Sequence, residues 1–557
     1  MPQASLFLMT NNCFMNISPY LKSLAIGLLI IIPWKVFITG AIPSPDSGSI
    51  KNLLHEKIDH LEQYLSLDQG IEIYAIPSVI KTYRNRNYNP VWERRQDIDD
   101  LITAIKQSYD HGLSPSDYHI SILEQMSIAR TAEEKVLRDI ILTDAFLLLT
   151  SHIISGKTDP KTRNAQWHVV KSERNPITYI DDISKEPLLP VLERLYPMHI
   201  NYDLLKQQLE KYRKIEAEGG WPEISLGAML KPGMSDPRIP QIKARLRVTG
   251  EYNSYVDQEN NTYDDELQKS VVKFQKKHGI EALGNIGPET TIAMNTPVKE
   301  RIKTLEVNLE RWRWLPAEFS QYYVLVNIAN FELEIIDNKQ QINHQKVIVG
   351  RAYRKTPVFK SVMEYLDINP TWTVPPTILR NDLVPEIQKN VRYLTDKNIT
   401  VFSPDGKMLN PDSVNWNSNS VFSYTYRQKP GKSNALGRIK FMFPNTYNVY
   451  LHDTPTRELF NRTERAFSSG CIRVEKPIEL AELLLADQGK WSQTSIKKAI
   501  ETNKTQTIRL TRKPEVYLLY WTAWIDQEGN HHFSKDIYDR DHSIYIALNS
   551  RPVYDLA

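Results

Sequence analysis

Cysteine is nearly absent from this chain of 557 residues, which contains only Cys13 and Cys471. Cys13 precedes a short apolar segment and is lost if that segment is removed, so the mature chain would have one thiol and no internal disulfide. A lone cysteine in an exported chain is open to oxidation and gives no structural crosslink. Cys471 is therefore either a buried apolar residue, as free cysteines often are, or a reactive one.

Long hydrophobic runs are lacking as well. The segment Leu24 to Trp34 (LAIGLLIIIPW) has eleven residues, whereas a helix that spans a bilayer needs about 20. Lys22 precedes this segment, Lys35 follows it, and the small residues at 39–41 offer a cleavage site. The pattern predicts an export signal over residues 1–42, which is either cleaved or kept as a membrane anchor.

An excess of charge of one sign is also missing. The chain has 69 Lys and Arg against 66 Asp and Glu, a net charge of +3, and no basic block. This balance excludes a dedicated nucleic-acid binder. Hydrophobic residues at 41% and charged residues at 24% are ordinary for folded protein. The length then predicts roughly three or four domains.

The first folded region, residues 43–219, is predicted to be a helical scaffold domain that follows a short Pro/Ser linker. Leu101, Ile102 and Ile105 and the run Ile141 to Gly156 have the apolar density of buried helical faces. Glycines followed by prolines punctuate the region in the manner of helix ends.

Residues 220–297 are predicted to form a separate small helical module. Leu267, Val271 and Phe274 have the spacing of one helical face. The pattern of a helix ending in FQ, an HG turn and a G-x-x-G-x-x-T start resembles the three-helix peptidoglycan-binding module. Leu283 stands where that family often has Asp, which leaves ligand binding open. A generic helical spacer is the alternative.

Beyond a linking helix predicted at 298–318, short segments rich in β-branched residues predict a mainly β domain at 319–512 and a β extension at 513–557. The predicted strands are Tyr323–Ile328, Phe331–Ile336, Lys346–Gly350, Met363–Ile368, Lys440–Phe443, Val449–His452 and Gln506–Leu510, with YLLYWTAW and IYIAL in the extension. A polar insertion at about 375–437 interrupts them. Its length favours a functional lid over a plain loop.

The residues best suited to chemistry lie in two short motifs, His452-Asp453-Thr454-Pro455 and Ser468-Ser469-Gly470-Cys471-Ile472-Arg473-Val474. Acyl transfer by a thiol needs a base or imidazolium beside the sulfur, backbone donors for the oxyanion, and a cation for an anionic substrate. His452, Gly470 and Arg473 supply these beside Cys471.

Metal binding is the rival use of Cys and His. Zinc takes three or four ligands, and His344, His531 and His532 show no ligand spacing with the Cys471 motif. We therefore expect no metal and no cofactor. A buried structural cysteine remains the other alternative.

The two motifs, read as H-x(15)-S-S-G-C-I-R-V after YLHDTP, resemble the catalytic motif of L,D-transpeptidases with a YkuD-type domain. The order of signal, helical region, small module, catalytic domain and aromatic-rich tail resembles the large periplasmic enzymes of Gram-negative bacteria. This resemblance implies a multidomain α+β fold: a helical N-terminal scaffold, a three-helix peptidoglycan-binding module and a mainly β catalytic domain with an inserted lid. It also implies a periplasmic location, with the inner membrane involved only if the signal is retained.

The resemblance implies four catalytic positions. Cys471 attacks the carbonyl of meso-diaminopimelate in a tetrapeptide stem and releases D-Ala. His452 activates the thiol and then the acceptor amine, and the backbone carbonyl of Asp453 orients its ring. The amides of Gly470 and Cys471 bind the oxyanion.

Four further positions are expected to bind substrate. Tyr450 assists the oxyanion donors, and Arg473 holds the substrate or forms a salt bridge under the loop. Trp372 either walls the cleft or packs in the core. Ser469 replaces the histidine of many family members, as in the large periplasmic branch, and its role is left open.

The expected partners are peptidoglycan tetrapeptide stems and, in addition, other wall-synthesis enzymes. Two rival functions remain. One is an exported cysteine hydrolase or sortase-like acyltransferase, although sortase-like enzymes carry their arginine on a later strand. The other is a non-catalytic scaffold that binds the wall. The acceptor of the acyl group is left open among stem peptides, a lipoprotein and free D-amino acids.

Overall fold

The computed structural model describes residues 47–67, 70–160, 167–169, 174–254, 260–552 and 554. The predicted export signal at 1–42 and Cys13 lie outside these residues. Within the described ranges, no helix combines the length and the apolar character that crossing a bilayer requires.

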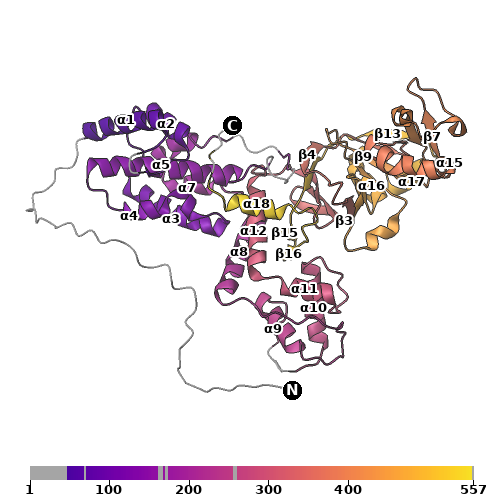
Figure 1. Cartoon of the computed structure of the whole chain (residues 1–557), viewed down its shortest axis with the longest axis horizontal. Helices are drawn as coiled ribbons and strands as arrows, with labels where there is room; N and C mark the ends of the chain where they lie inside the picture. Colours follow the sequence, from indigo (N-terminus) through magenta and orange to yellow (C-terminus); the bar gives the residue numbers. More distant parts are fainter. Residues whose placement is uncertain are drawn as a thin grey trace, which may run out of the picture. The chain divides into compact units, whose positions relative to one another are not determined.

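A group of helices fills residues 47–217, as the sequence predicts. They are α1 (Ser47–Tyr64), α2 (Ile76–Asn85), α3 (Arg95–Gln107), α4 (Ile120–Gln125), α5 (Ala132–Ser155), α6 (Thr178–Lys185), α7 (Leu188–Glu193) and α8 (Ile200–Ala217). Thr131 and Glu134 form a capping box that starts α5. Residues 139–150 of α5 are all buried because α1, α2, α3 and α4 surround it (Figure 1). A helix that is apolar on all sides belongs in such a core.

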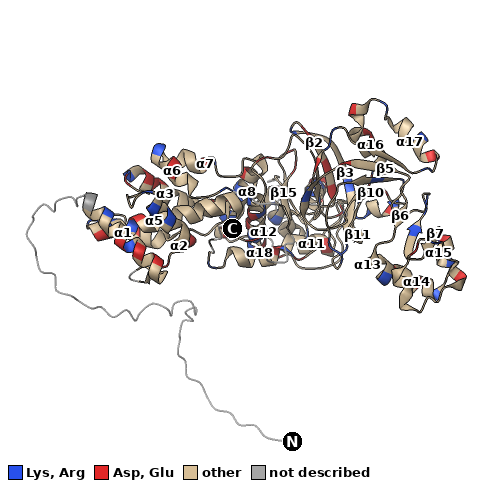
Figure 2. Cartoon of the chain, turned by 90° about the horizontal axis from the view of Figure 1, so that it is seen from above, with Lys and Arg blue, Asp and Glu red and all other residues tan. Residues whose placement is uncertain are grey.

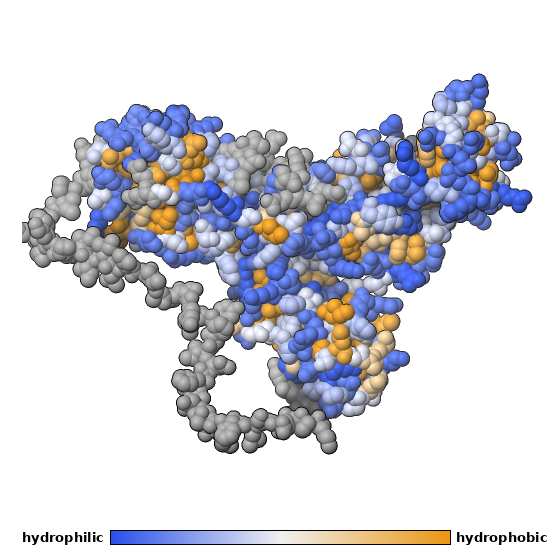
Figure 3. Space-filling model, in the orientation of Figure 1, coloured by the Kyte–Doolittle hydropathy of each residue, from blue (hydrophilic) through white to orange (hydrophobic). Residues whose placement is uncertain are grey.

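The small module consists of α9 (Ile239–Thr249), α10 (Asp265–Lys277) and α11 (Pro288–Asn295), which share a core of their own. The Gln275 side chain accepts from the Gly284 amide at 2.9 Å and donates to the Asn285 carbonyl at 2.7 Å. The glutamine of the FQ pair thus clamps the turn before α11. Figure 3 shows apolar residues on the module surface, where Leu283 and Ile292 are exposed.

The linking helix α12 (Val298–Arg313) packs against α8 and against the C-terminal helix α18 (Asp541–Leu548). The segment IYIAL lies in α18, so the strand predicted there is wrong. Ile544 and Leu548, four residues apart, are both buried, and Arg311 of α12 pairs with Asp541 at 2.7 Å. Tertiary packing on α12 therefore overrides the β propensity of a short aromatic and β-branched run.

The β domain is built on one sheet with strand order β13-β5-β9-β10-β12-β3-β2-β1-β14-β4, and β11 pairs with β3. Its strands are β1 (Tyr322–Asn327), β2 (Glu332–Asp337), β3 (Gln340–Gly350), β4 (Phe359–Val362), β5 (Tyr365–Ile368), β9 (Ile439–Met442), β10 (Leu451–His452), β11 (Ala466–Ser468), β12 (Ile472–Val474), β13 (Gln506–Arg509) and β14 (Glu515–Leu519). Helices α16 (Pro477–Leu484) and α17 (Gln493–Glu501) contact β9 and β5. Strand β14 lies between β1 and β4, so the sheet continues past the boundary predicted at residue 512.

The insertion is a folded unit with its own core. It contains α13 (Pro376–Ile378), the π-helical turn η4 (Leu379–Leu383), α14 (Val384–Lys389), α15 (Arg392–Asp396) and the strands β6 (Trp372–Thr373), β7 (Ile399–Phe402) and β8 (Thr425–Gln428). These strands form a second sheet in the order β6-β8-β7. Figure 2 shows β6 and β7 in the same region as α13, α14 and α15. Val374, Leu383 and Tyr426 are buried together. At its base, the Asn434 side chain donates to the Pro370 carbonyl at 3.1 Å, which holds the two ends together.

Candidate active site

The two sequence motifs meet on neighbouring strands of the main sheet. His452 on β10 pairs with Arg473 on the parallel strand β12 and with Lys440 on the antiparallel strand β9. Paired residues on adjacent strands share one face, and residues two apart on a strand share it too. Tyr450, His452, Cys471, Arg473 and Lys440 therefore lie on the same face of three adjacent strands.

The Cys471 side chain is half-buried. Its Sγ lies 3.6 Å from the Asn448 carbonyl oxygen. Burial raises the pKa of the Cys471 thiol, and hydrogen bonds from the Tyr450 backbone and side chain act in the opposite direction. Raising a thiol pKa favours the neutral form, which is the weaker nucleophile. The thiol therefore needs a base during the reaction.

His452 is buried, and one of its ring nitrogens is already committed. Its Nδ1 lies 2.5 Å from the Asp453 carbonyl oxygen. A carbonyl can only accept, so Nδ1 carries the proton and Nε2 of the neutral ring is unprotonated. The ring also hydrogen bonds with the Leu436 backbone. Burial, reinforced by the charge of Arg473, lowers the pKa of His452 to about 3. His452 is thus a neutral base held in one tautomer.

The two pKa directions bear on how His452 could activate Cys471. A stable thiolate–imidazolium pair requires a lowered thiol pKa and a protonated histidine. Burial instead raises the pKa of Cys471 and lowers the pKa of His452. The structure therefore favours a neutral thiol beside a neutral imidazole in the resting protein.

The Asp453 side chain holds the strand that carries His452. Its carboxylate accepts from the Arg438 amide at 2.8 Å and from the Arg457 guanidinium at 2.9 Å. A Cβ on Gly437, whose φ is +62°, would lie 2.4 Å from the Asp453 carboxyl carbon. The close packing of Gly437 and Asp453 fixes the carbonyl that orients His452.

Tyr450 and Lys440 complete the polar face. The Tyr450 ring lies 5.7 Å from the His452 ring, and the Lys440 ammonium lies 4.2 Å from the Tyr450 ring centroid. Burial and the neighbouring thiol raise the pKa of Tyr450, so its hydroxyl stays protonated and can donate. Lys440 was missed by the sequence analysis. A lysine within the apolar strand IKFM is unusual, and this was the feature of the sequence that could have drawn attention to it. Its place beside His452 becomes apparent only from the strand pairing.

The loop before Cys471 is tightly folded. Gly470 has φ +115°, a conformation that disfavours residues with a side chain. Its amide donates to Ser468 Oγ at 3.1 Å, and Ser468 Oγ donates to the Cys471 carbonyl at 2.5 Å. The Gly470 amide, an expected oxyanion donor, is therefore directed at Ser468.

The loop between β3 and β4 packs against this turn. Thr356 Oγ1 donates to the Gly470 carbonyl at 2.9 Å, and a Cβ on Gly350 would lie 3.1 Å from the Gly470 Cα. Tyr538 of the C-terminal segment donates to the Gly350 carbonyl at 2.6 Å and accepts from the Thr356 amide at 3.1 Å. The C-terminal segment thus braces the nucleophile loop through two layers of hydrogen bonds.

We expect Tyr538→Phe to weaken this brace without touching the thiol. It leaves the Gly350 carbonyl and the Thr356 amide without their buried partner, which costs about 1–3 kcal/mol. Thermal unfolding should show the loss, and acylation of Cys471 should slow because the loop is looser. Tyr545→Phe on the same segment, where the ring is only partly buried, is the control and should change neither. Equal melting temperatures and rates for Tyr538→Phe and wild type would contradict the brace.

The expected substrate-binding residues are dispersed around the thiol. Arg473 donates to Thr456 Oγ1 at 3.1 Å, while Ser469 is exposed and accepts from the Arg354 guanidinium at 2.8 Å. Trp372 hydrogen bonds with Tyr450. Arg354 was also missed by the sequence analysis, because it lies more than a hundred residues before Ser469.

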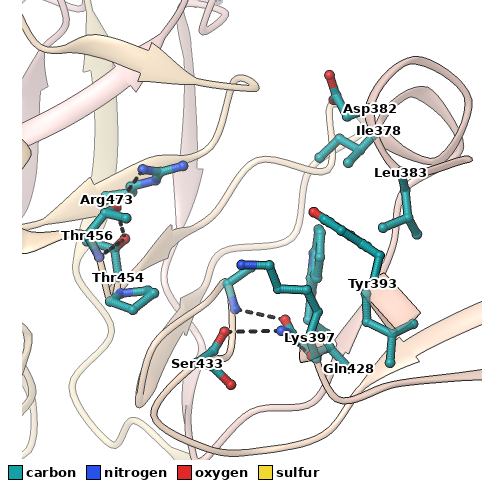
Figure 4. Close-up of a pocket in the computed structure, with 14 residues that line it drawn as sticks. Ile378, Asp382, Leu383, Tyr393, Lys397, Gln428, Ser433, Thr454, Thr456 and Arg473 are labelled. Carbon is teal, nitrogen blue, oxygen red and sulfur yellow. Dashed lines mark hydrogen bonds between the residues drawn. The ribbon is translucent and has the colours of Figure 1, made fainter. Parts of the chain in front are cut away.

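A pocket of about 270 Å³ opens between the sheet and the insertion (Figure 4). One wall is formed by Thr454, Thr456 and Arg473, and the facing wall by residues of the insertion. The insertion contributes Ile378, Asp382, Leu383, Tyr393, Lys397, Ile399, Gln428 and Ser433, and Trp372 of β6 also lines the pocket. Cations on both walls and two aromatic rings suit an extended ligand that carries carboxylates. Among the described residues, no cluster of His, Cys, Asp and Glu could hold a metal.

Comparisons with known proteins cover the part of the chain that carries this site. A family model described as the L,D-transpeptidase catalytic domain (YkuD) matches residues 321–503, and a model of a scaffold domain matches residues 77–209. A Haemophilus influenzae protein that carries a provisional L,D-transpeptidase name is 38% identical over 244 residues. That match takes in 44% of this chain and 49% of the relative, so it spans about half the length of the curated protein.

Solved structures of two L,D-transpeptidases are also similar in part. The Stackebrandtia nassauensis protein is 14% identical, with 54% of this chain and 96% of that chain covered at a TM-score of 0.21. The Xylanimonas cellulosilytica protein is 14% identical, with 53% and 98% covered at a TM-score of 0.18. The match of the catalytic model carries the assignment: this chain has a YkuD-type L,D-transpeptidase catalytic domain at residues 321–503, joined to a helical scaffold domain.

Proposed function

We propose that this protein is a cysteine L,D-transpeptidase that acts on peptidoglycan stem peptides and forms cross-links between diaminopimelate residues. The observation that carries the proposal is the placement of Cys471 and His452 on one face of adjacent strands, with His452 Nδ1 bonded to the Asp453 carbonyl. This leaves a basic nitrogen on the face that carries a neutral thiol.

Acylation begins when Cys471 Sγ attacks the carbonyl carbon of the third stem residue. The thiol proton passes to His452 Nε2 as the C–S bond forms and the carbonyl electrons move to oxygen. The Cys471 amide and the Tyr450 hydroxyl are the proposed oxyanion donors. The Gly470 amide joins them only if it leaves Ser468 Oγ. Collapse breaks the bond to the terminal D-Ala, whose nitrogen takes the proton from His452.

The second half of the reaction transfers the acyl group to an amine. His452, neutral again, removes a proton from the acceptor amine as that amine attacks the thioester. The C–S bond breaks, and the thiolate regains a proton from His452. A bound donor that covers the thiol limits the access of water and so favours transfer over hydrolysis.

The pocket is the proposed site of the donor stem. A stem peptide carries carboxylates along its length, and Arg473 and Lys397 lie on opposite walls of the pocket (Figure 4). Trp372 and Tyr393 provide flat surfaces for its apolar parts. These groups match an extended anionic peptide better than a neutral one.

Location and partners follow from the same proposal. A transpeptidase of the wall must be exported, and the apolar segment at 24–34 is the proposed signal to the periplasm. The three-helix module is the proposed second contact with peptidoglycan, with Leu283 and Ile292 exposed on its surface.

The direct test is incubation of the purified protein with a disaccharide tetrapeptide donor. We expect a covalent adduct on Cys471, release of D-Ala, and a dimer linked through two diaminopimelate residues, all identified by mass spectrometry. A tripeptide as the sole product would indicate a hydrolase. Binding to the wall without any adduct would indicate a non-catalytic scaffold.

Excision of the insertion should separate folding from donor binding. Asn369 donates its amide to the Arg438 carbonyl at 2.8 Å, so residues 371–435 can be replaced by a short glycine turn. The insertion has its own core, and the main sheet should keep its fold. Donor turnover should fall roughly a hundredfold, as expected when a substrate is no longer positioned.

Because the excision also removes Trp372, the variant Trp372→Ala is its control. It should lose less activity than the excision if the whole pocket wall matters. The measurements are circular dichroism for folding and D-Ala release for turnover. Unchanged kinetics in a folded excision variant would rule out a role for the insertion in donor binding.

A further inference from the structure

We propose that Arg354 is a positioning residue that couples the insertion to the nucleophile loop, so that the position of the insertion is transmitted to Cys471. Arg354 lies on the loop between β3 and β4, outside both sequence motifs. The inference rests on the proposed function, because it assigns a role to Arg354 in that reaction. It concerns a contact between two segments that are distant in the sequence.

The Arg354 guanidinium bonds to both segments at once. Its Nη1 donates to Ser469 Oγ at 2.8 Å, two residues before Cys471. The same Nη1 and Nη2 donate to the two carboxylate oxygens of Asp382 in η4, the second at 3.1 Å. A planar guanidinium can serve a carboxylate and a hydroxyl in fixed directions, which a lysine ammonium does less well.

The bidentate geometry, with two nitrogens on two carboxylate oxygens, distinguishes this contact from an ordinary surface ion pair. The Arg354 side chain is 11% exposed, although the Asp382 carboxylate is 43% exposed. The hydrogen bond that Arg354 donates to Asp382 raises the pKa of Arg354, which keeps the guanidinium charged. Asp382 also lies in the only π-helical turn among the described residues, and such turns are frequent at functional sites.

The loop that carries Arg354 is bonded to the nucleophile loop on either side of Ser469. The Arg351 amide donates to the Ser468 carbonyl at 3.0 Å, and Thr356 Oγ1 donates to the Gly470 carbonyl at 2.9 Å. Residues 468 and 470 are therefore tied to the framework of the sheet. Through its bonds to Ser469 and Asp382, Arg354 connects the insertion to the nucleophile loop.

The same carboxylate faces the substrate pocket. Asp382 lines the 270 Å³ pocket together with Arg473 and Tyr393 (Figure 4). A donor that fills the pocket holds the insertion in place and so preserves the Asp382–Arg354 contact. When the insertion moves away, Arg354 loses its carboxylate and Ser469 loses its fixed donor. Occupancy of the pocket is thus linked to the geometry of the residues beside Cys471.

The test compares Asp382→Asn with Glu386→Gln in the full chain. Glu386 is a matched control, since it is a carboxylate of the insertion that pairs only with the neighbouring Lys389, at 2.7 Å, among the described contacts. Three quantities are measured: donor acylation, amide hydrogen exchange, and the rate at which iodoacetamide alkylates Cys471, read from its peptide by mass.

We expect Asp382→Asn to slow acylation three- to tenfold, the size of one weakened charge-assisted hydrogen bond. Hydrogen exchange should rise both in η4 and in residues 466–472, and the alkylation rate should change. Asp382→Glu should restore most of the wild-type behaviour, and Glu386→Gln should match wild type throughout.

A change confined to the insertion, with wild-type exchange at 466–472 and wild-type alkylation, would overturn the coupling and leave a structural ion pair. Equal behaviour of Asp382→Asn and Glu386→Gln would overturn it too. Failure of the wild-type protein to react with any stem peptide would count against the proposed function instead. The exchange and alkylation measurements would still decide the role of Arg354.

Discussion

Cys471→Ala is expected to abolish acyl-enzyme formation and cross-linking while the fold is preserved. The Cys471 thiol is the nucleophile of the proposed mechanism, and alanine removes its sulfur with little change in side-chain volume. Purified wild type should gain the mass of a carbapenem on the peptide that contains Cys471. The variant should gain none, and its cross-linking activity should fall below detection.

Cys13→Ala is the matched control for this result, because it removes the other thiol of the chain. It should keep full activity. Circular dichroism and the melting temperature of Cys471→Ala should resemble those of wild type. A carbapenem adduct that forms in Cys471→Ala would show that another residue is the nucleophile.

His452→Ala is expected to lower acylation by roughly a hundredfold or more, which is the usual effect of losing a general base. Because the pKa of His452 is lowered to about 3, the ring is neutral and able to accept a proton at every pH above that value. Activity should therefore not fall as pH drops from 7 to 5 through protonation of this histidine. His344→Ala, which removes an exposed imidazole, should leave acylation unchanged.

The pH dependence of alkylation distinguishes a base from a preformed ion pair. The raised pKa of the Cys471 thiol places the rise in iodoacetamide reactivity above the ordinary thiol value of about 8.5. The profile of His452→Ala should lie close to that of wild type even though its acylation is strongly reduced. If wild type instead reacts well below pH 8 and the variant does not, then the pair is a thiolate–imidazolium pair at rest.

Local patterns in the sequence predicted the helical elements well. The spacing of Leu267, Val271 and Phe274 gave α10, and the dense apolar run after Ile141 gave the buried half of α5. Helical periodicity is a property of neighbouring residues, so it is visible without the fold. Periodicity gave the wrong result at IYIAL, because a run of five residues is too short to distinguish a strand from the helix α18.

The candidate site was predicted only as far as its residues are close in sequence. Gly470 beside Cys471, and His452 beside Asp453, are visible as motifs because a turn and a ring orientation are local features. Lys440 and Arg354 have no such signal. Their roles depend on strand pairing and on a loop that folds beneath the site from more than a hundred residues away.

The sequence by itself determined the helical periods, the strand candidates and the chemical identity of a thiol, an imidazole and a guanidinium in two short motifs. The tertiary structure decided the rest: β14 within the sheet, the folded insertion, the Tyr538 brace and the Arg354 contact with Asp382. It also shifted the pKa values of Cys471 and His452. A pKa depends on the burial and the charges that distant segments bring to a group, and these exist only once the chain has folded.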